Sequence, residues 1–226
     1  MGPSMSPNRE VTAALLRGLP IFADTPQEAL VAVARVCLMR QVAHHARVVR
    51  AGEPIDFVYL VLAGRLNVLV DDEEGREAIS SVLGPGDLFG EMGVLDEEVR
   101  SATVVAVAPS TLVAIGKTDF KRCLRENFDV TRYVMRNLCQ RLRLADRSIE
   151  SLALLDVAGR VVRLLAELAH TTNGEQGGNA RISRQEIAKM VGASREMVSR
   201  VVKDLELRGL IEVSDGRIVL REAGRR

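Results

Sequence analysis

The chain has 226 residues, of which 47% are hydrophobic and only 3% aromatic, and its formal net charge is +1. This length predicts two domains, each with a core built mainly from Leu, Val, Ile and Ala. No hydrophobic run approaches the roughly 18 residues of a membrane span, and the N-terminus lacks the pattern of a secretory signal, so we expect a cytoplasmic protein without a membrane partner.

The first predicted element is a helix over residues 25–36, because Thr25 can cap it and Pro26 suits its first turn. From residue 42 to 115, short runs of β-type residues alternate with turn residues, which predicts a small β jelly roll. The clearest predicted strands are residues 47–50, 57–62, 65–70, 78–83 and 111–115.

The glycine-rich segment before the last of these strands combines several features of an anion site. Gly90 and Gly93 allow the backbone to approach a ligand closely, and their N–H groups can form an anion-binding nest. Arg100 carries a fork of donors that suits phosphate oxygens, and Ser101 adds a hydroxyl. Glu91 is a carboxylate beside an anion, which makes sense if it accepts a hydrogen bond from a sugar hydroxyl. The segment therefore predicts a pocket for a ringed sugar phosphate.

From residue 129 to 155 the chain contains no glycine or proline, and its hydrophobic residues follow alternating steps of three and four. This heptad pattern predicts a long helix that pairs with its copy in a parallel homodimer. The alternative is one amphipathic helix packed on its own barrel. The predicted seam consists of Met135, Leu138, Leu142, Ala145, Ile149 and Leu152, and Arg136, Arg141, Arg143 and Arg147 lie outside it.

A second domain is predicted to begin at Asp156, which can cap a helix over residues 157–169. The polar stretch 171–179 then has the composition of a loop. Near the C-terminus, residues 210–220 alternate around Asp215-Gly216, which is a strong signal for a two-residue hairpin. This hairpin would form the wing of a winged helix.

Two short helices separated by a glycine turn are predicted before this hairpin. Ser183 and Glu186 form a capping box for a helix over residues 185–191, and Gly192 and Ser194 lead into a second helix. This is the helix-turn-helix arrangement, whose second helix lies in the major groove of DNA. The inward face of that second helix consists of Val198, Val201, Val202 and Leu205.

The charge distribution favours DNA as the partner of this region. Residues 181–226 contain 11 basic and 7 acidic side chains, whereas the rest of the chain has a net charge of −3. Arginine can contact guanine bidentately, glutamate can accept from cytosine, and flanking basic residues can anchor phosphates. The alternative is a small helical domain whose charges are merely solvated. The predicted DNA-contacting residues are Arg184, Ser194, Arg195, Glu196, Ser199, Arg200 and Lys203.

Together these motifs resemble the Crp–Fnr family of bacterial transcription regulators, in particular its cyclic AMP receptor branch. The resemblance runs from about Leu19 to Ile218 and is most specific over residues 89–102, 152–160 and 182–200. It implies a DNA-binding regulator, not an enzyme, that works as a homodimer under the allosteric control of a cyclic nucleotide.

The fold that this resemblance implies is of the α+β class. Residues 1–128 would form a cyclic-nucleotide-binding jelly roll, residues 129–155 a dimerisation helix, and residues 156–226 a winged helix-turn-helix domain. The implied partners are a palindromic operator with half-sites similar to TGTGA, and RNA polymerase. The polar loop 171–179 lies where the cyclic AMP receptors contact the polymerase, but it differs from theirs in length and composition, which puts activation through it in doubt.

By resemblance, Glu91 would bind the ribose 2′-hydroxyl, while Arg100 and Ser101 would hold the cyclic phosphate. Arg195, Glu196 and Arg200 would contact base edges. The complete predicted effector site consists of Phe89, Gly90, Glu91, Met92, Gly93, Arg100, Ser101, Ala102, Ala145 and Asp146.

The chain departs from the cyclic AMP receptors in two places. The segment between Gly90 and Arg100 is one residue shorter. In addition, Ala145 and Asp146 stand where the family has the Thr and Ser that hold adenine. Ala145 has no polar side chain, and ionised Asp146 only accepts hydrogen bonds, which suits the two adjacent donors of guanine. Cyclic AMP is the first candidate effector, and cyclic di-GMP or cyclic GMP is the next. The remaining alternative is that the protein binds DNA without any ligand and that its pocket is vestigial.

A metalloenzyme of the cupin type is the rival from another class. His44 and His45 are neighbours, and on a strand their side chains would point to opposite faces, so they could not share a metal ion. The three cysteines, Cys37, Cys123 and Cys139, are widely separated and form no CxxC pair. They predict neither a disulfide framework nor a thiolate metal site. The chain also lacks the cysteine cluster of the Fnr branch. We therefore expect no catalytic and no metal site.

Overall fold

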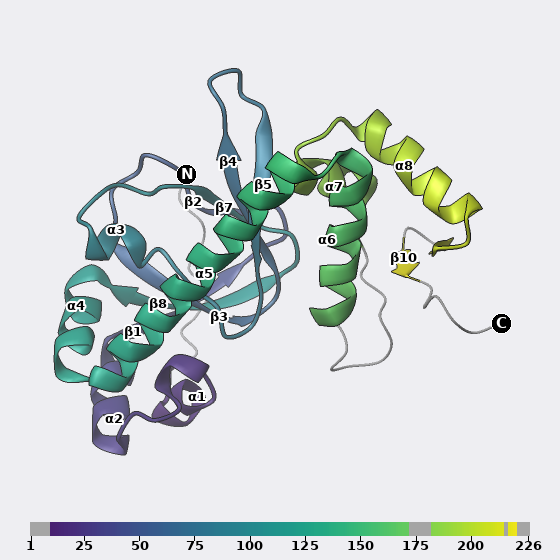
Figure 1. Ribbon diagram of the computed structural model, residues 1–226. Helices are drawn as coiled ribbons and strands as arrows, with labels where there is room; N and C mark the ends of the chain where they lie inside the picture. Colours follow the sequence, from purple (N-terminus) through teal and green to yellow (C-terminus); the bar gives the residue numbers. More distant parts are fainter. Residues whose placement is uncertain (1–9, 172–181, 215–216, 221–226) are drawn as a thin grey trace. The chain divides into compact units, whose positions relative to one another are not determined.

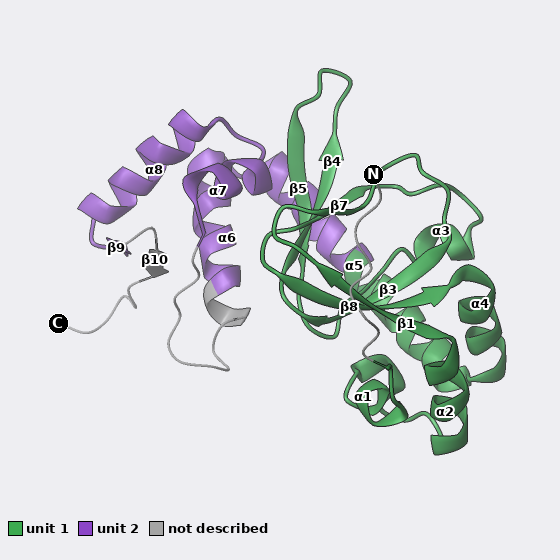
Figure 2. Cartoon of the chain, turned by 180° about the vertical axis from the view of Figure 1, so that it is seen from behind, with its two compact units in different colours: residues 1–141 green, residues 142–226 purple. Residues whose placement is uncertain are grey.

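The computed structural model describes residues 10–171, 182–214 and 217–220 (Figure 1). The chain divides into two compact units, residues 1–141 and 142–226 (Figure 2). One long helix, α5 (Phe128–Leu154), contributes residues to both units. Within the described ranges, no helix is long and hydrophobic enough to cross a membrane.

The first unit is built on two four-stranded antiparallel sheets, in the orders β1-β8-β3-β6 and β2-β7-β4-β5. The jelly roll predicted from the short alternating runs is therefore present, and three of its strands, β1, β6 and β7, lie outside the predicted runs. The strands are β1 (Cys37–Val42), β2 (Arg47–Val49), β3 (Phe57–Ala63), β4 (Leu66–Asp71), β5 (Glu77–Leu83), β6 (Leu88–Phe89), β7 (Thr103–Ala106) and β8 (Ser110–Gly116).

Four short helices and a 3-10 turn complete this unit. Figure 1 shows α1, α2 and α4 gathered on one side of the sheet that contains β1 and β8. The elements are α1 (Ala13–Arg17), the 3-10 turn η1 (Pro20–Phe22), α2 (Gln27–Val36), α3 (Met92–Leu95) and α4 (Lys117–Glu126).

The start of α2 corrects the predicted cap. The helix begins at Gln27 with Pro26 at the N-cap position, and no side chain caps it. Thr25 is 1% exposed, and within the described residues its hydroxyl has no hydrogen-bond partner. The prediction failed because the loop before α2 is tied to α1: the guanidinium of Arg17 donates to the carbonyl oxygens of Ala23 and Thr25. The Thr25 side chain is thus buried and does not cap the helix.

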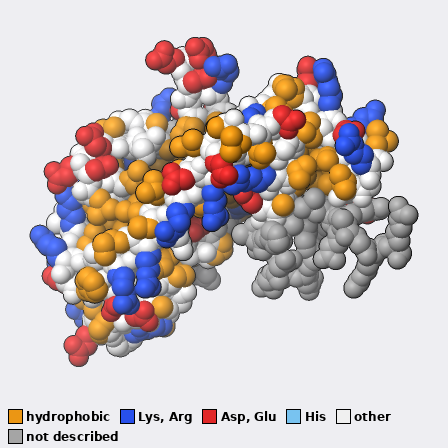
Figure 3. All heavy atoms as spheres, in the orientation of Figure 1, with side chains coloured by type: hydrophobic (Ala, Val, Ile, Leu, Met, Phe, Trp, Pro, Cys, Tyr) orange, Lys and Arg blue, Asp and Glu red, His pale blue; other side chains and the backbone are white. Residues whose placement is uncertain are grey.

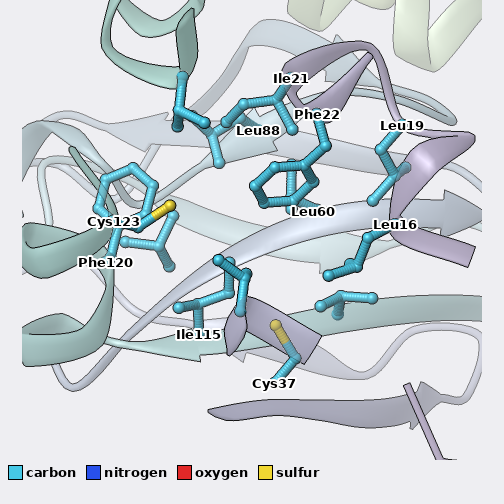
Figure 4. Close-up of a cluster of buried hydrophobic side chains, with 14 of the residues drawn as sticks. Leu16, Leu19, Ile21, Phe22, Cys37, Leu60, Leu88, Ile115, Phe120 and Cys123 are labelled. Atoms are coloured by element: carbon cyan, nitrogen blue, oxygen red, sulfur yellow. The ribbon is translucent and has the colours of Figure 1, made fainter. Parts of the chain in front are cut away.

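Strands β3 and β8 are buried on both faces, and this separates two cores in the first unit. Val58 and Leu60 of β3 belong to the core beneath the helices, whereas Tyr59 and Val61 belong to the core between the two sheets. Since successive side chains of a strand point to opposite faces, one strand serves both cores. Figure 4 shows the first core, where Phe22 and Leu60 lie close to one another.

The second unit contains α6 (Val157–Thr171), α7 (Arg184–Val191), α8 (Arg195–Leu207) and the hairpin strands β9 (Ile211–Ser214) and β10 (Arg217–Leu220). Its core includes side chains from all three helices and both strands. The antiparallel pairing of β9 with β10 confirms the predicted hairpin. The Asp215-Gly216 turn itself, and the predicted polar loop beyond Thr171, lie outside the described residues.

The predicted helix starts in this unit agree with the structure. Asp156 caps α6 by accepting a hydrogen bond from the Gly159 amide, with an Oδ1–N distance of 2.8 Å. Ser183 and Glu186 form both halves of the capping box on α7. Gly192 ends α7 with a left-handed φ of 64°, which other residues rarely adopt. These local signals therefore place α7 and α8 correctly.

Several hydrophobic side chains along α5 are exposed in the described part of the chain. Met135, Leu142, Ile149 and Leu152 of the predicted seam are each 48–64% exposed, and Leu138 packs partly against the first core. Figure 3 shows hydrophobic side chains along the face of the molecule that carries α5. Because monomeric proteins rarely expose such a continuous stripe, this surface favours a partner helix over the alternative of a helix packed only on its own barrel.

Candidate functional site

A cavity of about 290 Å³ lies in the first unit beside the glycine-rich segment. Small-molecule sites usually measure roughly 300–1,000 Å³, so this cavity suits one small ligand. Eight of the ten predicted effector-binding residues line it, namely Phe89, Gly90, Glu91, Met92, Gly93, Arg100, Ser101 and Ala102. The remaining two, Ala145 and Asp146, are exposed residues of α5 in the second unit.

The two glycines of the segment act in different ways. Gly90 has a left-handed φ of 83°, and a Cβ atom built on it would lie 2.1 Å from Nη1 of Arg100. Gly93 lies in α3 with an ordinary helical backbone, and its Cβ would lie 2.0 Å from Cδ1 of Ile55. Of the two glycines, only Gly90 therefore requires unusual dihedral angles, whereas Gly93 provides space for close packing. The sequence predicts the same role for both, and the structure corrects this.

Arg100 is 7% exposed, although it is a charged residue. Its Nη2 donates to the carbonyl oxygen of Phe57 at 2.6 Å, and its Nη1 donates to that of Gly90 at 3.4 Å. Burial lowers the pKa of Arg100, and the nearby Tyr59 opposes this effect. A guanidinium has five N–H groups, so these two bonds leave donors for an anion in the cavity.

Glu91 is the most deeply buried charged group of the site, with 1% exposure. Its Oε1 accepts a hydrogen bond from Nη1 of Arg141 on α5 at 2.8 Å, and Arg141 Nη2 donates to the carbonyl oxygen of Leu88. Within the described residues, Glu91 Oε2 is buried without a partner. Burial raises the pKa of Glu91, and the charges of Arg141 and Arg100 partly offset that rise.

An unpartnered buried carboxylate oxygen is costly and needs an explanation. In this cavity the missing partner can be a hydroxyl of a bound ligand, because Glu91 and Arg100 line the same cavity and can serve a hydroxyl and an anion of one molecule. The arrangement is therefore suited to a sugar phosphate.

Sequence reasoning missed three polar residues of the cavity. For Arg141, the heptad pattern predicts only a position outside the hydrophobic seam. In the structure its side chain pairs with Glu91, which lies fifty positions earlier in the chain. Ser80 and Ser81 line the cavity from β5, and the Ser80 hydroxyl donates to the carbonyl oxygen of Val68 at 3.3 Å. Nothing in the local pattern of β5 distinguishes these serines, since only the strand register places them at the cavity.

The helix-turn-helix presents a second candidate surface. Val198, Val202 and Leu205 of α8 are buried in the core of the second unit, which leaves the opposite side of α8 free. Ser199 is half-buried, and its hydroxyl donates to the Arg195 carbonyl at 2.8 Å, so its donor is already used. The exposed predicted DNA residues are Arg184, Ser194, Arg195, Glu196, Arg200 and Lys203.

Comparison with known proteins matches both parts of the chain that carry these candidate sites. The sequence matches the family models of a cyclic nucleotide-binding domain over residues 39–127 and of a Crp-like helix-turn-helix domain over residues 159–225. The cAMP-activated global transcriptional regulator CRP of Pasteurella multocida is 35% identical over 188 residues, which cover 81% of this chain and 90% of that protein. The chain belongs to the Crp–Fnr family of transcription regulators.

Two further proteins are similar to this Crp–Fnr regulator. The cAMP-activated global transcriptional regulator Vfr of Pseudomonas aeruginosa is 33% identical over 191 residues, covering 81% of this chain and 89% of that protein. Among solved structures, the c-di-GMP responsive global regulator CLP of Xanthomonas campestris has a TM-score of 0.73 and 29% identity, and the match covers 84% of this chain and 96% of that chain. The regulator is thus a DNA-binding protein with a cyclic nucleotide-binding domain, not an enzyme.

The two adjacent histidines require a correction. His44 and His45 lie in the turn between β1 and β2, not on a strand, and their rings stack with centroids 3.7 Å apart. The predicted placement of their side chains on opposite faces was therefore wrong, because His45 turns the chain with a φ of 63°. In the described ranges, no group of three or more His, Cys, Asp or Glu side chains is arranged to hold a metal ion.

We expect two kinds of DNA contact from α8, and they can be separated by substitution. Arg200→Ala should weaken binding to a duplex with two inverted TGTGA half-sites by about 5- to 100-fold and relax the preference at one base pair. Lys203→Ala should weaken binding to all sequences alike and reduce the salt slope by about 1. Fluorescence anisotropy across a salt series measures both effects.

The matched control is Arg208→Ala, because Arg208 lies just after α8 and is paired with Asp204 at 3.0 Å. This variant should bind the duplex like the unmodified protein. Equal losses for Arg200→Ala on specific and random duplexes would contradict the assignment of Arg200 to a base edge.

Proposed function

We propose that this regulator is a cytoplasmic homodimer whose binding to a palindromic operator is controlled by cyclic AMP held in the cavity of each first unit. The observation that carries the proposal is the buried Glu91 carboxylate, whose second oxygen lacks a partner in the described residues beside the buried guanidinium of Arg100. One polar wall that offers both an acceptor for a hydroxyl and donors for an anion suits a ribose cyclic phosphate.

In this proposal each polar group of the wall has one task. The remaining N–H donors of Arg100 and the hydroxyl of Ser101 hold the cyclic phosphate, because charge-assisted bonds from a guanidinium are strong and directional. Glu91 Oε2 accepts a hydrogen bond from the ribose 2′-hydroxyl. Gly90 keeps the segment close enough for these contacts, since any side chain there would displace Arg100.

The base of the nucleotide decides between the candidate effectors. The cavity, at about 290 Å³, favours a mononucleotide over the larger cyclic di-GMP. Asp146 supports a guanine base instead, because an ionised carboxylate can accept from both donors on one edge of guanine. The similar CLP regulator of Xanthomonas campestris is c-di-GMP responsive, which keeps the dinucleotide among the candidates to be tested.

Titration calorimetry of the unmodified protein with cyclic AMP, cyclic GMP and cyclic di-GMP tests the effector. We expect cyclic AMP to bind most tightly. Asp146→Ser should leave cyclic AMP binding unchanged or improve it, because it restores a hydroxyl that can both donate and accept. If a guanine nucleotide binds most tightly and loses affinity on Asp146→Ser, the guanine hypothesis replaces the cyclic AMP one.

The second candidate function is a DNA-binding regulator that needs no effector. Unchanged operator affinity with and without all three nucleotides, measured on the same preparation, would establish it in place of the proposed one. The unpartnered oxygen of Glu91 argues against an effector-independent regulator. A buried acceptor without a partner is costly, and in a cavity that binds no ligand nothing would offset this cost.

The proposed switch acts through the dimer. The exposed hydrophobic stripe on α5 pairs with its copy, and the nucleotide shifts the equilibrium only if it binds the DNA-competent arrangement more tightly. That arrangement sets the two recognition helices α8 about 34 Å apart, one turn of DNA. At its promoters we propose that the bound dimer contacts RNA polymerase.

A further inference from the structure

The guanidinium of Arg100 lies over an aromatic ring, that of Tyr59. The Cζ atom of Arg100 is 5.9 Å from the centroid of the Tyr59 ring, within the range of a cation–π contact. Tyr59 lies on β3 and is 4% exposed, and it is not one of the described residues that line the cavity. Any effect of its ring on a ligand is therefore indirect and passes through its cavity-lining neighbours, Arg100 and Phe89.

Tyr59 is itself held in place from two other directions. Its ring stacks on Phe89 with centroids 5.1 Å apart and an interplanar angle of 20°. The two residues are also partners in the backbone register of β3 and β6. Arg40 on β1 donates from Nη1 to the Tyr59 hydroxyl at 2.9 Å. A ring fixed by a stacked neighbour and a hydrogen bond can serve as a rigid support.

Arg100 is confined on several sides at once. The carbonyl oxygens of Phe57 and Gly90 accept from its two terminal nitrogens, and its Cζ atom lies over the Tyr59 ring. Gly90 leaves the space that the guanidinium needs, because a Cβ there would lie 2.1 Å from Nη1. A free arginine side chain has many rotamers, and ordering it on binding weakens affinity, so a pre-oriented one binds an anion more tightly.

We propose that Tyr59 is a positioning residue for the phosphate subsite: its ring orients the Arg100 guanidinium so that the remaining N–H groups point into the cavity before the ligand arrives. The proposal deepens the function proposed above and rests on it for the ligand, although the orientation of Arg100 can be measured without any nucleotide. The ring carries this role, and the hydroxyl serves only to anchor the ring to Arg40.

Two substitutions separate the ring from the hydroxyl. Tyr59→Phe keeps the ring and should change cyclic AMP affinity by less than about twofold. Tyr59→Leu removes the ring and should weaken cyclic AMP binding by about tenfold, within the range of desolvated cation–π contacts. Titration calorimetry measures both variants. If Tyr59→Leu fails to fold, Tyr59→Met replaces it, since the flexible methionine side chain fills irregular spaces.

A second measurement uses the protein without a ligand. In ¹⁵N relaxation measurements on the whole protein, the Arg100 Nε–H signal should report greater mobility when the ring is removed and unchanged mobility in Tyr59→Phe, because the ring confines the guanidinium. The matched control is Phe22→Leu, which removes a fully buried ring from the other core of the first unit. It should leave both the signal and the affinity unchanged.

The possible outcomes either support or overturn the role of Tyr59 in positioning Arg100. Equal mobility of the Arg100 Nε–H group in Tyr59→Leu and in the unmodified protein overturns the proposal, and so does an equal loss of affinity in Phe22→Leu. If the unmodified protein binds none of the three nucleotides, the proposed function fails, while the NMR comparison still accepts or rejects the role of Tyr59. A loss of affinity in Tyr59→Leu with rescue in Tyr59→Phe supports both.

Discussion

Arg100→Ala is expected to weaken cyclic nucleotide binding by about 100-fold or more and to remove the effect of the nucleotide on operator binding. The guanidinium is buried and lines the cavity. Arg100 is the only Lys or Arg in the segment 84–106. Truncation removes the charge-assisted bonds to phosphate and leaves the anion with the neutral Ser101 hydroxyl in place of a cationic partner.

DNA binding without a nucleotide should survive this substitution. The helix-turn-helix has its own core, and its contacts with phosphates depend on salt and not on the effector. Operator binding measured by anisotropy, with and without nucleotide, tests this. Arg122→Ala is the matched control, since Arg122 lies on α4 and pairs with Asp119 at the surface. A normal response of Arg100→Ala to nucleotide would show that the phosphate is held elsewhere.

Glu91→Gln is expected to have two opposite effects. It should weaken cyclic AMP binding by about 10- to 100-fold, because a hydrogen bond from ribose to a charged acceptor is replaced by one to a neutral amide. It should also raise the melting temperature of the ligand-free protein at neutral pH by about 2 °C or more, because the cost of burying a charge disappears. Arg141 then loses its charged partner, but it keeps the hydrogen bond to the Leu88 carbonyl oxygen, and its side chain is 34% exposed.

The pH dependence of stability gives an independent test of the same residue. Burial raises the pKa of Glu91 above its ordinary value of 4.5. The folded protein thus binds this proton more tightly than the unfolded chain does. The resulting stability is fully present below about pH 4.5 and is lost as the pH rises through the folded pKa. Melting curves should show this loss in the unmodified protein and a flatter profile in Glu91→Gln.

Glu97→Gln is the control for this experiment. The exposed Glu97 pairs with Lys121 at 2.6 Å, and this ion pair lowers its pKa. Its contribution therefore has the opposite sign: it is present above the ordinary pKa and is lost as the pH falls. If Glu91→Gln lowers the melting temperature at neutral pH as Glu97→Gln does, the buried carboxylate stabilises the fold and the expected conflict between stability and function is absent.

The predictable part of the site is the part that is local in sequence. Eight of the predicted effector residues lie in the one segment from Phe89 to Ala102, so their pattern could be recognised before any fold was known. The structure brings these eight to one cavity. Arg141 lies fifty positions after Glu91, and only the packing of α5 brings their side chains together. Ser80 and Ser81 depend in the same way on the register of β5 with β4.

The fold shows the same division between local and distant information. Capping boxes and glycine turns predicted α7 and α8, because those signals lie within a few residues of the helix ends. Strand β1 was missed because it follows α2 directly, with no turn residue between Val36 and Cys37. Helix α4 was missed for a related reason: it starts at Lys117, immediately after β8, without a loop to mark the change.

The three cysteines differ in a way that makes the native chain convenient for spectroscopy. Burial raises the pKa of Cys37 to about 12 and that of Cys123 to about 11, so neither forms a thiolate at neutral pH. Cys139 is exposed on α5. A maleimide spin label would therefore attach at Cys139, once per chain and without any engineered cysteine, and the distance between two labels would report directly on how a pair of these helices responds to a nucleotide.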